Sequence, residues 1–107
     1  MLDGLFRIYL NVKVSLIGRD LKRLVREVAT EEFRVRQSGD DKDLVYDVCV
    51  VSDAEKQRLA SDSQLSARLS ALPARYRYPR KARLHIEFQS QETIDREYDG
   101  KWHYYFA

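Results

Sequence analysis

The chain of 107 residues has the length of one domain and the composition of a globular protein, with 44% hydrophobic and 34% charged residues. A net charge of +2 excludes an argument for nucleic-acid binding from bulk charge alone. Cys49 is the single cysteine, so an internal disulfide is excluded and a cytoplasmic location is expected. We see no leader and no apolar run of bilayer length, so no membrane partner is expected.

The first stretch alternates apolar and polar side chains. Its even positions from Phe6 to Leu16 are apolar, which predicts a β-strand with one solvent-exposed face. Gly18 is expected to end this strand. Asp20 is expected to cap a helix that runs to about Glu32, because apolar side chains then recur at helical spacing.

A β-hairpin is predicted next. Phe33 to Arg36 begins a short strand, and residues 38–43 (Ser-Gly-Asp-Asp-Lys-Asp) have the chemistry of a turn. Leu44 to Val51 is the most apolar and β-prone run of the chain, so we expect it to be the interior strand of the sheet.

A second helical region follows the hairpin. Ser52 and Glu55 match a capping box, S-x-x-E. Ser61-Asp62-Ser63 is expected to break the region in two, and Pro73 to end it. Its apolar stripe is formed by leucines, Leu59, Leu65, Leu69 and Leu72.

The last third of the chain begins with a basic, aromatic connector over residues 74–83. Leu84 to Phe88 alternates and predicts a fourth strand. Residues 90–98 suit either a helical turn or a strand. Asp99-Gly100 is typical of a type I′ hairpin, which would make Lys101 to Phe106 a fifth strand.

This element order predicts one α+β domain over residues 1–107. The expected fold is ferredoxin-like, βαββαβ with an added C-terminal β-strand or hairpin, and has an antiparallel sheet with two helices on one face. The other face would be open and polar. Small-molecule binding or enzyme activity there would use residues from several strands: Tyr9, Asn11, Lys13, Asp47, Cys49, His85 and Glu87.

Specific chemistry on that open face has little support. Cys49 lies within an apolar strand, where a cysteine is usually a small buried hydrophobic residue. Asp47 and Glu87 form the carboxylate pair that would suit acid–base catalysis, but the sequence gives no distance between them. His85 and Glu87 lack the tight spacing of a metal motif. We therefore predict no catalytic residue, no metal and no cofactor.

Two binding surfaces remain as alternatives. A nucleic-acid site would combine cations with stacking rings in the connector. An interface would use apolar and aromatic residues on the open face and the last strand. The nucleic-acid candidates are Arg75, Tyr76, Arg77, Tyr78, Arg80 and Lys81, and the interface candidates are Val45, Trp102, Tyr104 and Phe106.

The interaction hypothesis is favoured over both alternatives. It predicts a small cytoplasmic binding protein without a catalytic motif, either a homodimer or the partner of another protein. An accessory role of the immunity or antitoxin type would suit this size. Nucleic-acid binding is the first alternative, and a small-molecule or enzyme site on the open face is the second.

Overall fold

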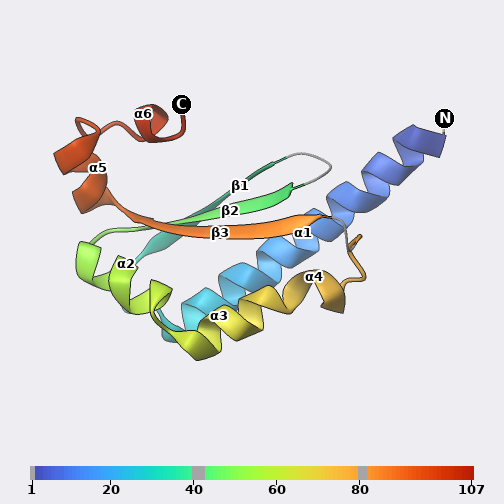
Figure 1. Ribbon diagram of the computed structural model, residues 1–107, viewed down its shortest axis with the longest axis horizontal. Helices are drawn as coiled ribbons and strands as arrows, with labels where there is room; N and C mark the ends of the chain where they lie inside the picture. The colour runs from blue at the N-terminus through green and yellow to red at the C-terminus, as the bar shows by residue number, and fades with distance from the viewer. Residues whose placement is uncertain (1, 40–42, 80–81) are drawn as a thin grey trace.

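A computed structural model describes residues 2–39, 43–79 and 82–107. Its sheet consists of β1 (Phe33–Gly39), β2 (Asp43–Val50) and β3 (Arg83–Ser90). β2 lies in the centre, antiparallel to β1 and parallel to β3 (Figure 1). The predicted hairpin and the central position of the most apolar strand are therefore confirmed, while residues 40–42 of the expected turn lie outside the described ranges.

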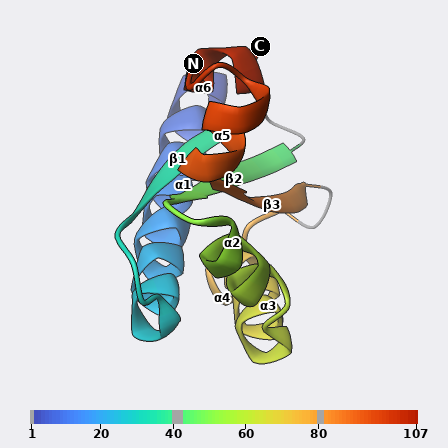
Figure 2. The same ribbon diagram turned by 90° about the vertical axis from the view of Figure 1, so that its left-hand side faces the viewer.

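Helices lie on both sides of this sheet. One side is covered by α1 (Leu2–Val28), α2 (Asp53–Ala60), α3 (Ser63–Ser70) and α4 (Leu72–Arg75). α5 (Gln91–Glu97) and α6 (Trp102–Tyr105) follow the end of β3 and turn to the other side (Figures 1 and 2). No helix within the described ranges has both the length and the apolar character needed to cross a bilayer.

The core lies between α1 and the central strand. Buried α1 side chains recur every three or four residues, which aligns them along one side of a helix. Tyr46 of β2 is fully buried, and its hydroxyl donates a 2.8 Å hydrogen bond to the Val14 carbonyl oxygen. Gly18 faces this ring, since a Cβ there would lie 3.3 Å from Tyr46 Cε1. The α1 residues of this core are Leu10, Val14, Ile17, Leu21, Leu24 and Val25.

The ferredoxin-like prediction is wrong, and the largest error is at the N-terminus. Residues 6–16 belong to α1 and not to a strand, so the helix expected from Asp20 is the second half of a longer one. The sheet of the described residues has three strands in mixed orientation, where a fully antiparallel sheet was expected. α2, α3 and α4 form the crossover that makes β2 and β3 parallel.

The C-terminal prediction also fails. Residues 101–106 contain α6 and form no fifth strand, and the ambiguous stretch at 90–98 contains α5. Asp99 and Gly100 do adopt positive φ, 55° and 72°. They end a helix, however, because the Gly100 N–H donates to the Ile94 carbonyl oxygen, as in a glycine-terminated helix.

Within the second helical region, the predicted break is confirmed. α2 ends at Ala60, and the Asp62 side chain caps α3 by accepting from the Leu65 N–H. Pro73 does not stop the helix, since it lies in the first turn of α4, where its missing N–H has no helical partner to lose. Ser52 caps α2 as expected, accepting from the Glu55 N–H.

The second bond of a capping box, from the Ser52 N–H to the Glu55 carboxylate, is replaced by bonds to a segment distant in sequence. The Glu55 carboxylate turns away from Ser52 and accepts from the backbone N–H groups of Thr30 and Glu31, at 2.7 and 3.0 Å. In exchange, Glu31 accepts from the Ser52 N–H at 3.0 Å and from the Ser52 hydroxyl at 2.7 Å. These reciprocal bonds join the end of α1 to the start of α2 and fix both beside the sheet.

Candidate functional site

The open face of the sheet carries alternate residues of all three strands. Since Tyr46 and Val48 point to the core, Asp47 and Cys49 point the other way. The register places Arg36 of β1 and Glu87 of β3 on either side of Asp47. Of the predicted open-face residues, the structure brings together Asp47, Cys49, His85 and Glu87, whereas Tyr9, Asn11 and Lys13 lie on α1.

Asp47 is the most buried charged group of this face, with 6% of its surface exposed. Burial raises the pKa of its carboxyl group, the Arg36 guanidinium 4.0 Å away opposes that shift, and Glu87 adds to it. The C-terminal segment lies near this group: the Arg36 guanidinium is 3.8 Å from the Phe106 ring centre. Burial, followed by the Asp47 and Glu87 charges, raises the pKa of Tyr105. The C-terminal residues Tyr105 and Phe106 thus lie close to the charged groups around Asp47.

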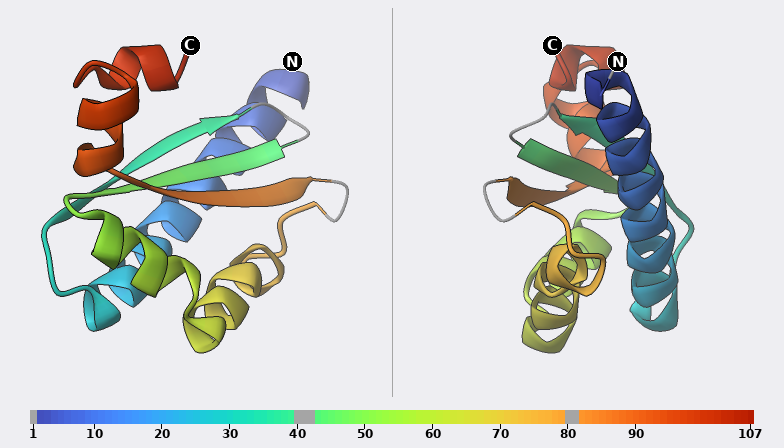
Figure 3. Two further views of the ribbon diagram at one scale, coloured as in Figure 1. Left: turned by 60° about the vertical axis from the view of Figure 1, so that its left-hand side comes forward. Right: turned by 90° about the vertical axis from the view of Figure 1, so that its right-hand side faces the viewer.

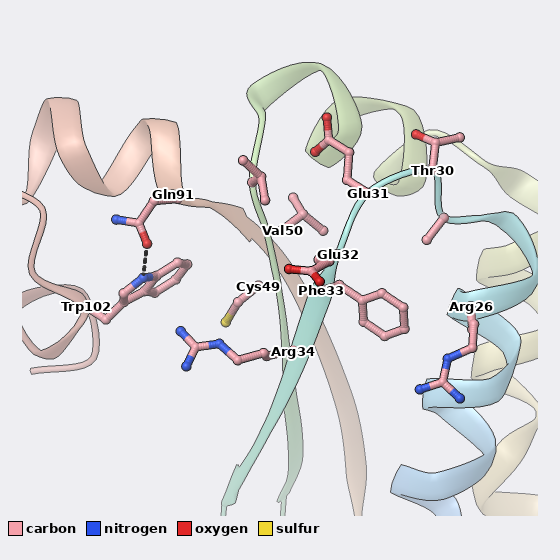
Figure 4. Close-up of a pocket in the computed structure, with 12 residues that line it drawn as sticks. Arg26, Thr30, Glu31, Glu32, Phe33, Arg34, Cys49, Val50, Gln91 and Trp102 are labelled. Carbon is pink, nitrogen blue, oxygen red and sulfur yellow. Dashed lines mark hydrogen bonds between the residues drawn. The ribbon is translucent and has the colours of Figure 1, made fainter.

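A shallow pocket of about 740 Å³ lies beside the start of β1 and the end of β2 (Figure 4). Arg34, Cys49 and Trp102 line one part of it, and the Trp102 indole N–H donates a 2.7 Å hydrogen bond to the Gln91 side-chain oxygen. Burial, followed by the nearby Asp47 charge, raises the pKa of the Cys49 thiol. The thiol is therefore neutral at physiological pH and is a poor nucleophile.

The remaining open-face groups do not form a metal centre. His85 Nε2 lies 3.5 Å from an Asp43 carboxylate oxygen, and Arg83 Nε lies 3.0 Å from the same oxygen. Across residues 2–39, 43–79 and 82–107, no three His, Cys, Asp or Glu side chains lie close enough to share a metal ion.

The two rings of the basic, aromatic connector are buried or partly buried. Tyr78 is buried, with 7% exposed, and the Tyr76 hydroxyl donates to the Asp20 carboxylate. Arg75 is exposed, and the Arg77 carbonyl oxygen accepts from Lys13 Nζ at 3.2 Å. Arg80 and Lys81 lie outside the described residues. Stacking of bases on these tyrosines, which the nucleic-acid alternative requires, has no support from this arrangement.

The predicted aromatic interface packs largely against itself. Trp102 stacks on Phe106 with ring centres 5.9 Å apart, and Tyr105 meets both rings edge to face. Tyr104 alone of the interface candidates is half exposed, while Val45 is partly buried on the open face. These rings complete the fold over the sheet.

A different apolar surface was not recognised from the sequence. The N-terminal part of α1 extends past the ends of the strands (Figures 1 and 3). The first half of α1 exposes five large side chains. We call these residues the α1 apolar surface: Leu5, Phe6, Ile8, Tyr9 and Val12, which are 66%, 54%, 62%, 53% and 54% exposed.

The far side of α1, which faces away from the core, changes from apolar to charged along the helix. In the second half, the side chains opposite the core are charged, as expected for a helix packed on one side only. In the first half, Ile8 and Val12 occupy the same far side while Leu10 and Val14 face the core. Residues two apart on a helix point about 200° apart, so the alternation that resembled a strand is the signal of a helix with two opposite apolar faces. The charged residues of the second half are Arg19, Lys22, Arg23, Arg26 and Glu27.

Comparisons with protein-family models, with curated proteins and with solved structures found no match to this chain.

Proposed function

We propose that this protein acts by binding another protein, and that the α1 apolar surface receives an amphipathic helix of that partner. The observation that carries the proposal is the change along the far side of α1 from charged to apolar. A contiguous set of exposed large apolar side chains on a globular domain is typical of an interaction site. The accessory role and the cytoplasmic location expected from the sequence are part of this proposal.

The geometry favours a helix as the ligand. Leu5, Ile8 and Val12 follow one another at intervals of three and four residues, which forms a narrow apolar line along α1. Such a line matches a second helix packed alongside, as in coiled coils and helix-in-groove complexes. A bilayer surface would instead favour a broad apolar face, and α1 uses its opposite face for the core.

The charges favour a partner that differs from this chain. Between Gly4 and Leu16, α1 carries Arg7 and Lys13 and no acidic residue. A second copy of α1 would offer no acidic residue from this stretch to pair with these cations, so its charges do not select self-association. A helix with acidic side chains beside its apolar line would complement these cations and would be selected over a second copy.

The expected contribution of the surface is substantial. Full burial of a large apolar side chain contributes about 1.5–3 kcal/mol, and these five side chains are between half and two-thirds exposed. Completing the burial of Leu5, Ile8 and Val12, the three that form the line along α1, would contribute roughly 4 kcal/mol before the cost of association is subtracted. Replacement of both Ile8 and Val12 by lysine should therefore weaken binding by about a hundredfold or more.

Two probes test this proposal. The first is a synthetic amphipathic helix with leucines along one side and glutamates flanking them; its counterpart carries lysines in place of glutamates. We expect calorimetry to detect binding of the acidic peptide alone, and loss of that binding in the Ile8→Lys/Val12→Lys variant. The matched control is Arg19→Ser/Arg26→Ser, which changes two residues on the far side of the second half.

The second probe is a photo-crosslinking amino acid placed at position 8 in cells, with position 23 as the control. We expect position 8 to crosslink to a protein whose purified form binds the wild-type chain and not the lysine variant. Crosslinks to a second copy, equal crosslinking from both positions, or binding only to vesicles of anionic phospholipid would each contradict the proposal.

A further inference from the structure

The sheet has two outer strands, and their edges differ. β1 and β3 each pair with β2 on one side, and β3 faces solvent on the other (Figure 2). An outer strand presents unpaired N–H and C=O groups to any strand that aligns with it. The side chains of β3 between Arg83 and Phe88 alternate between exposed and partly exposed, so the helix-facing side of this strand is also incompletely covered.

A groove of mixed polar and apolar lining, whose polar part includes Ser66, Ser70 and Glu87, runs along that incompletely covered side. It has a volume of about 330 Å³, lies between β3 and the α2–α3 pair, and opens to solvent. Leu84, Ile86 and Phe88 of β3 contribute to it from the sheet, and Leu59 and Leu69 from the helices. The edge of β3 and the groove beside it are continuous, so one partner strand with its own apolar side would cover both.

The charges along β3 suit a second copy as that partner in two registers. A twofold axis would pair two β3 strands antiparallel, and residues facing each other must lie on the same side of the sheet. If Ile86 lies at the axis, Glu87 faces His85 of the other copy and Leu84 faces Phe88. If His85 lies at the axis, Glu87 faces Arg83 and Leu84 faces Ile86. Both registers therefore place Glu87 opposite a basic side chain and apolar residues opposite apolar ones, the arrangement that stabilises paired strands.

The outer edge of β1 carries charges that oppose self-pairing. In β1, Arg34 and Arg36 lie on one side of the strand, and each is exposed. If two β1 strands paired antiparallel about Val35, Arg34 of each copy would face Arg36 of the other. Like charges directly opposite each other destabilise a strand pair. Self-pairing is therefore expected at β3 and opposed at β1.

From these observations we infer that two copies associate through antiparallel pairing of β3. This pairing joins the two sheets into one six-stranded sheet and brings the apolar side chains of Leu84, Ile86 and Phe88 from both copies together at the twofold axis. The inference is independent of the α1 proposal. α1 lies on the β1 side of the sheet (Figure 2), so association through β3 leaves the α1 apolar surface of both copies accessible. A dimer of this form would be a bivalent binder.

The first test is the molar mass in solution, measured by light scattering after gel filtration over a wide range of concentrations. We expect twice the monomer mass of 12.6 kDa for the wild-type chain. Glu87→Lys should give monomers, because the introduced cation would face Arg83 or His85 of the other copy. This variant should fold normally, since it removes the acidic neighbour that disfavours ionisation of Asp47. The control, with a charge change of equal size and opposite sign, is Arg34→Glu on β1, which should remain dimeric.

The second test restores the interface. Arg83→Glu/His85→Glu should be monomeric alone, because acids would then face Glu87. When mixed with Glu87→Lys, it should form a heterodimer in either register. A wild-type chain that is monomeric at every concentration, a Glu87→Lys variant that stays dimeric, or two folded variants that fail to combine would each overturn the inference. Circular dichroism verifies folding of both variants, since Arg83 and His85 also contact Asp43 within their own chain.

Discussion

Replacing Glu55 by alanine removes a carboxylate that joins the loop after α1 to α2. Glu55 is 3% exposed, and one of its oxygens accepts from the Thr30 N–H, the Thr30 hydroxyl and the Glu31 N–H at 2.7–3.0 Å. The other oxygen accepts from Arg58 Nε at 2.8 Å. Burial alone would raise the pKa of Glu55, but these hydrogen bonds outweigh it and hold the pKa below its ordinary value.

The expected loss of stability follows from these bonds. A hydrogen bond to a charged group contributes about 1.5–3 kcal/mol, and the two backbone donors lose their partner in the alanine variant. Arg58 is 44% exposed, so its ion pair adds little. We expect Glu55→Ala to lower the free energy of unfolding by about 3 kcal/mol at neutral pH, or roughly 15 °C in Tm.

The assay is urea unfolding followed by circular dichroism, with Glu32→Ala as the control because Glu32 is an exposed acid in the same loop. The control should change stability by less than about 0.5 kcal/mol. The lowered pKa means that Glu55 stabilises the fold above its ordinary pKa and loses this effect as the pH falls below it, so the deficit of the variant should shrink in acid. A loss from Glu55→Ala no larger than that of the control, or one independent of pH, would refute the reasoning.

Four further substitutions or treatments give distinct outcomes. Gly18→Val should destabilise the chain by about 2 kcal/mol in thermal unfolding, since even a Cβ at this position contacts the fixed Tyr46 ring; unchanged stability would contradict that packing. Hydrogen bonds from two hydroxyl groups and an arginine lower the pKa of Asp53, so wild-type stability should fall as the pH drops below the ordinary value, and Asp53→Asn should flatten that acid limb. The pKa of Asp47 is raised by burial, so Asp47→Asn should be at least as stable as wild type at neutral pH and lose this advantage in acid; a less stable variant at pH 7 would show that the Arg36 pair dominates. Cys49 should react with iodoacetamide at least about tenfold more slowly in the native chain than in urea, and equal rates would show an accessible thiolate.

The hairpin and the central strand were predictable because their signals are local. Residues 44–51 combine an apolar, β-branched run with polar turn residues before it, and few other structures suit that pattern. The parallel orientation of β3 was not predictable in the same way. It depends on a crossover through α2–α4, and alternating strands have the same sequence pattern in either orientation.

The N-terminal error has a more specific cause. A period-two pattern is interpreted as a strand on the assumption that each element has one apolar face. α1 has two, one toward the core and one toward solvent, and together they produce strict alternation from Phe6 to Leu16. Gly18 then seemed to be a strand end, although it provides room for Tyr46 within a helix. The residues that misled the prediction of the fold are those that carry the proposed function.

The order of the strands along the chain has a consequence for folding. Gly39 and Leu44, paired across the hairpin, are close in sequence, whereas Leu44 pairs with Leu84 forty positions later. Closing the hairpin therefore costs little chain entropy, and the crossover costs more. Until β3 docks, the second edge of the most apolar strand is unpaired, which is the interval in which the chain is most prone to aggregate. After docking, the outer edge on this side of the sheet belongs to β3, which carries the charged or ionisable residues Arg83, His85 and Glu87. These side chains disfavour pairing with strands that lack complementary charges.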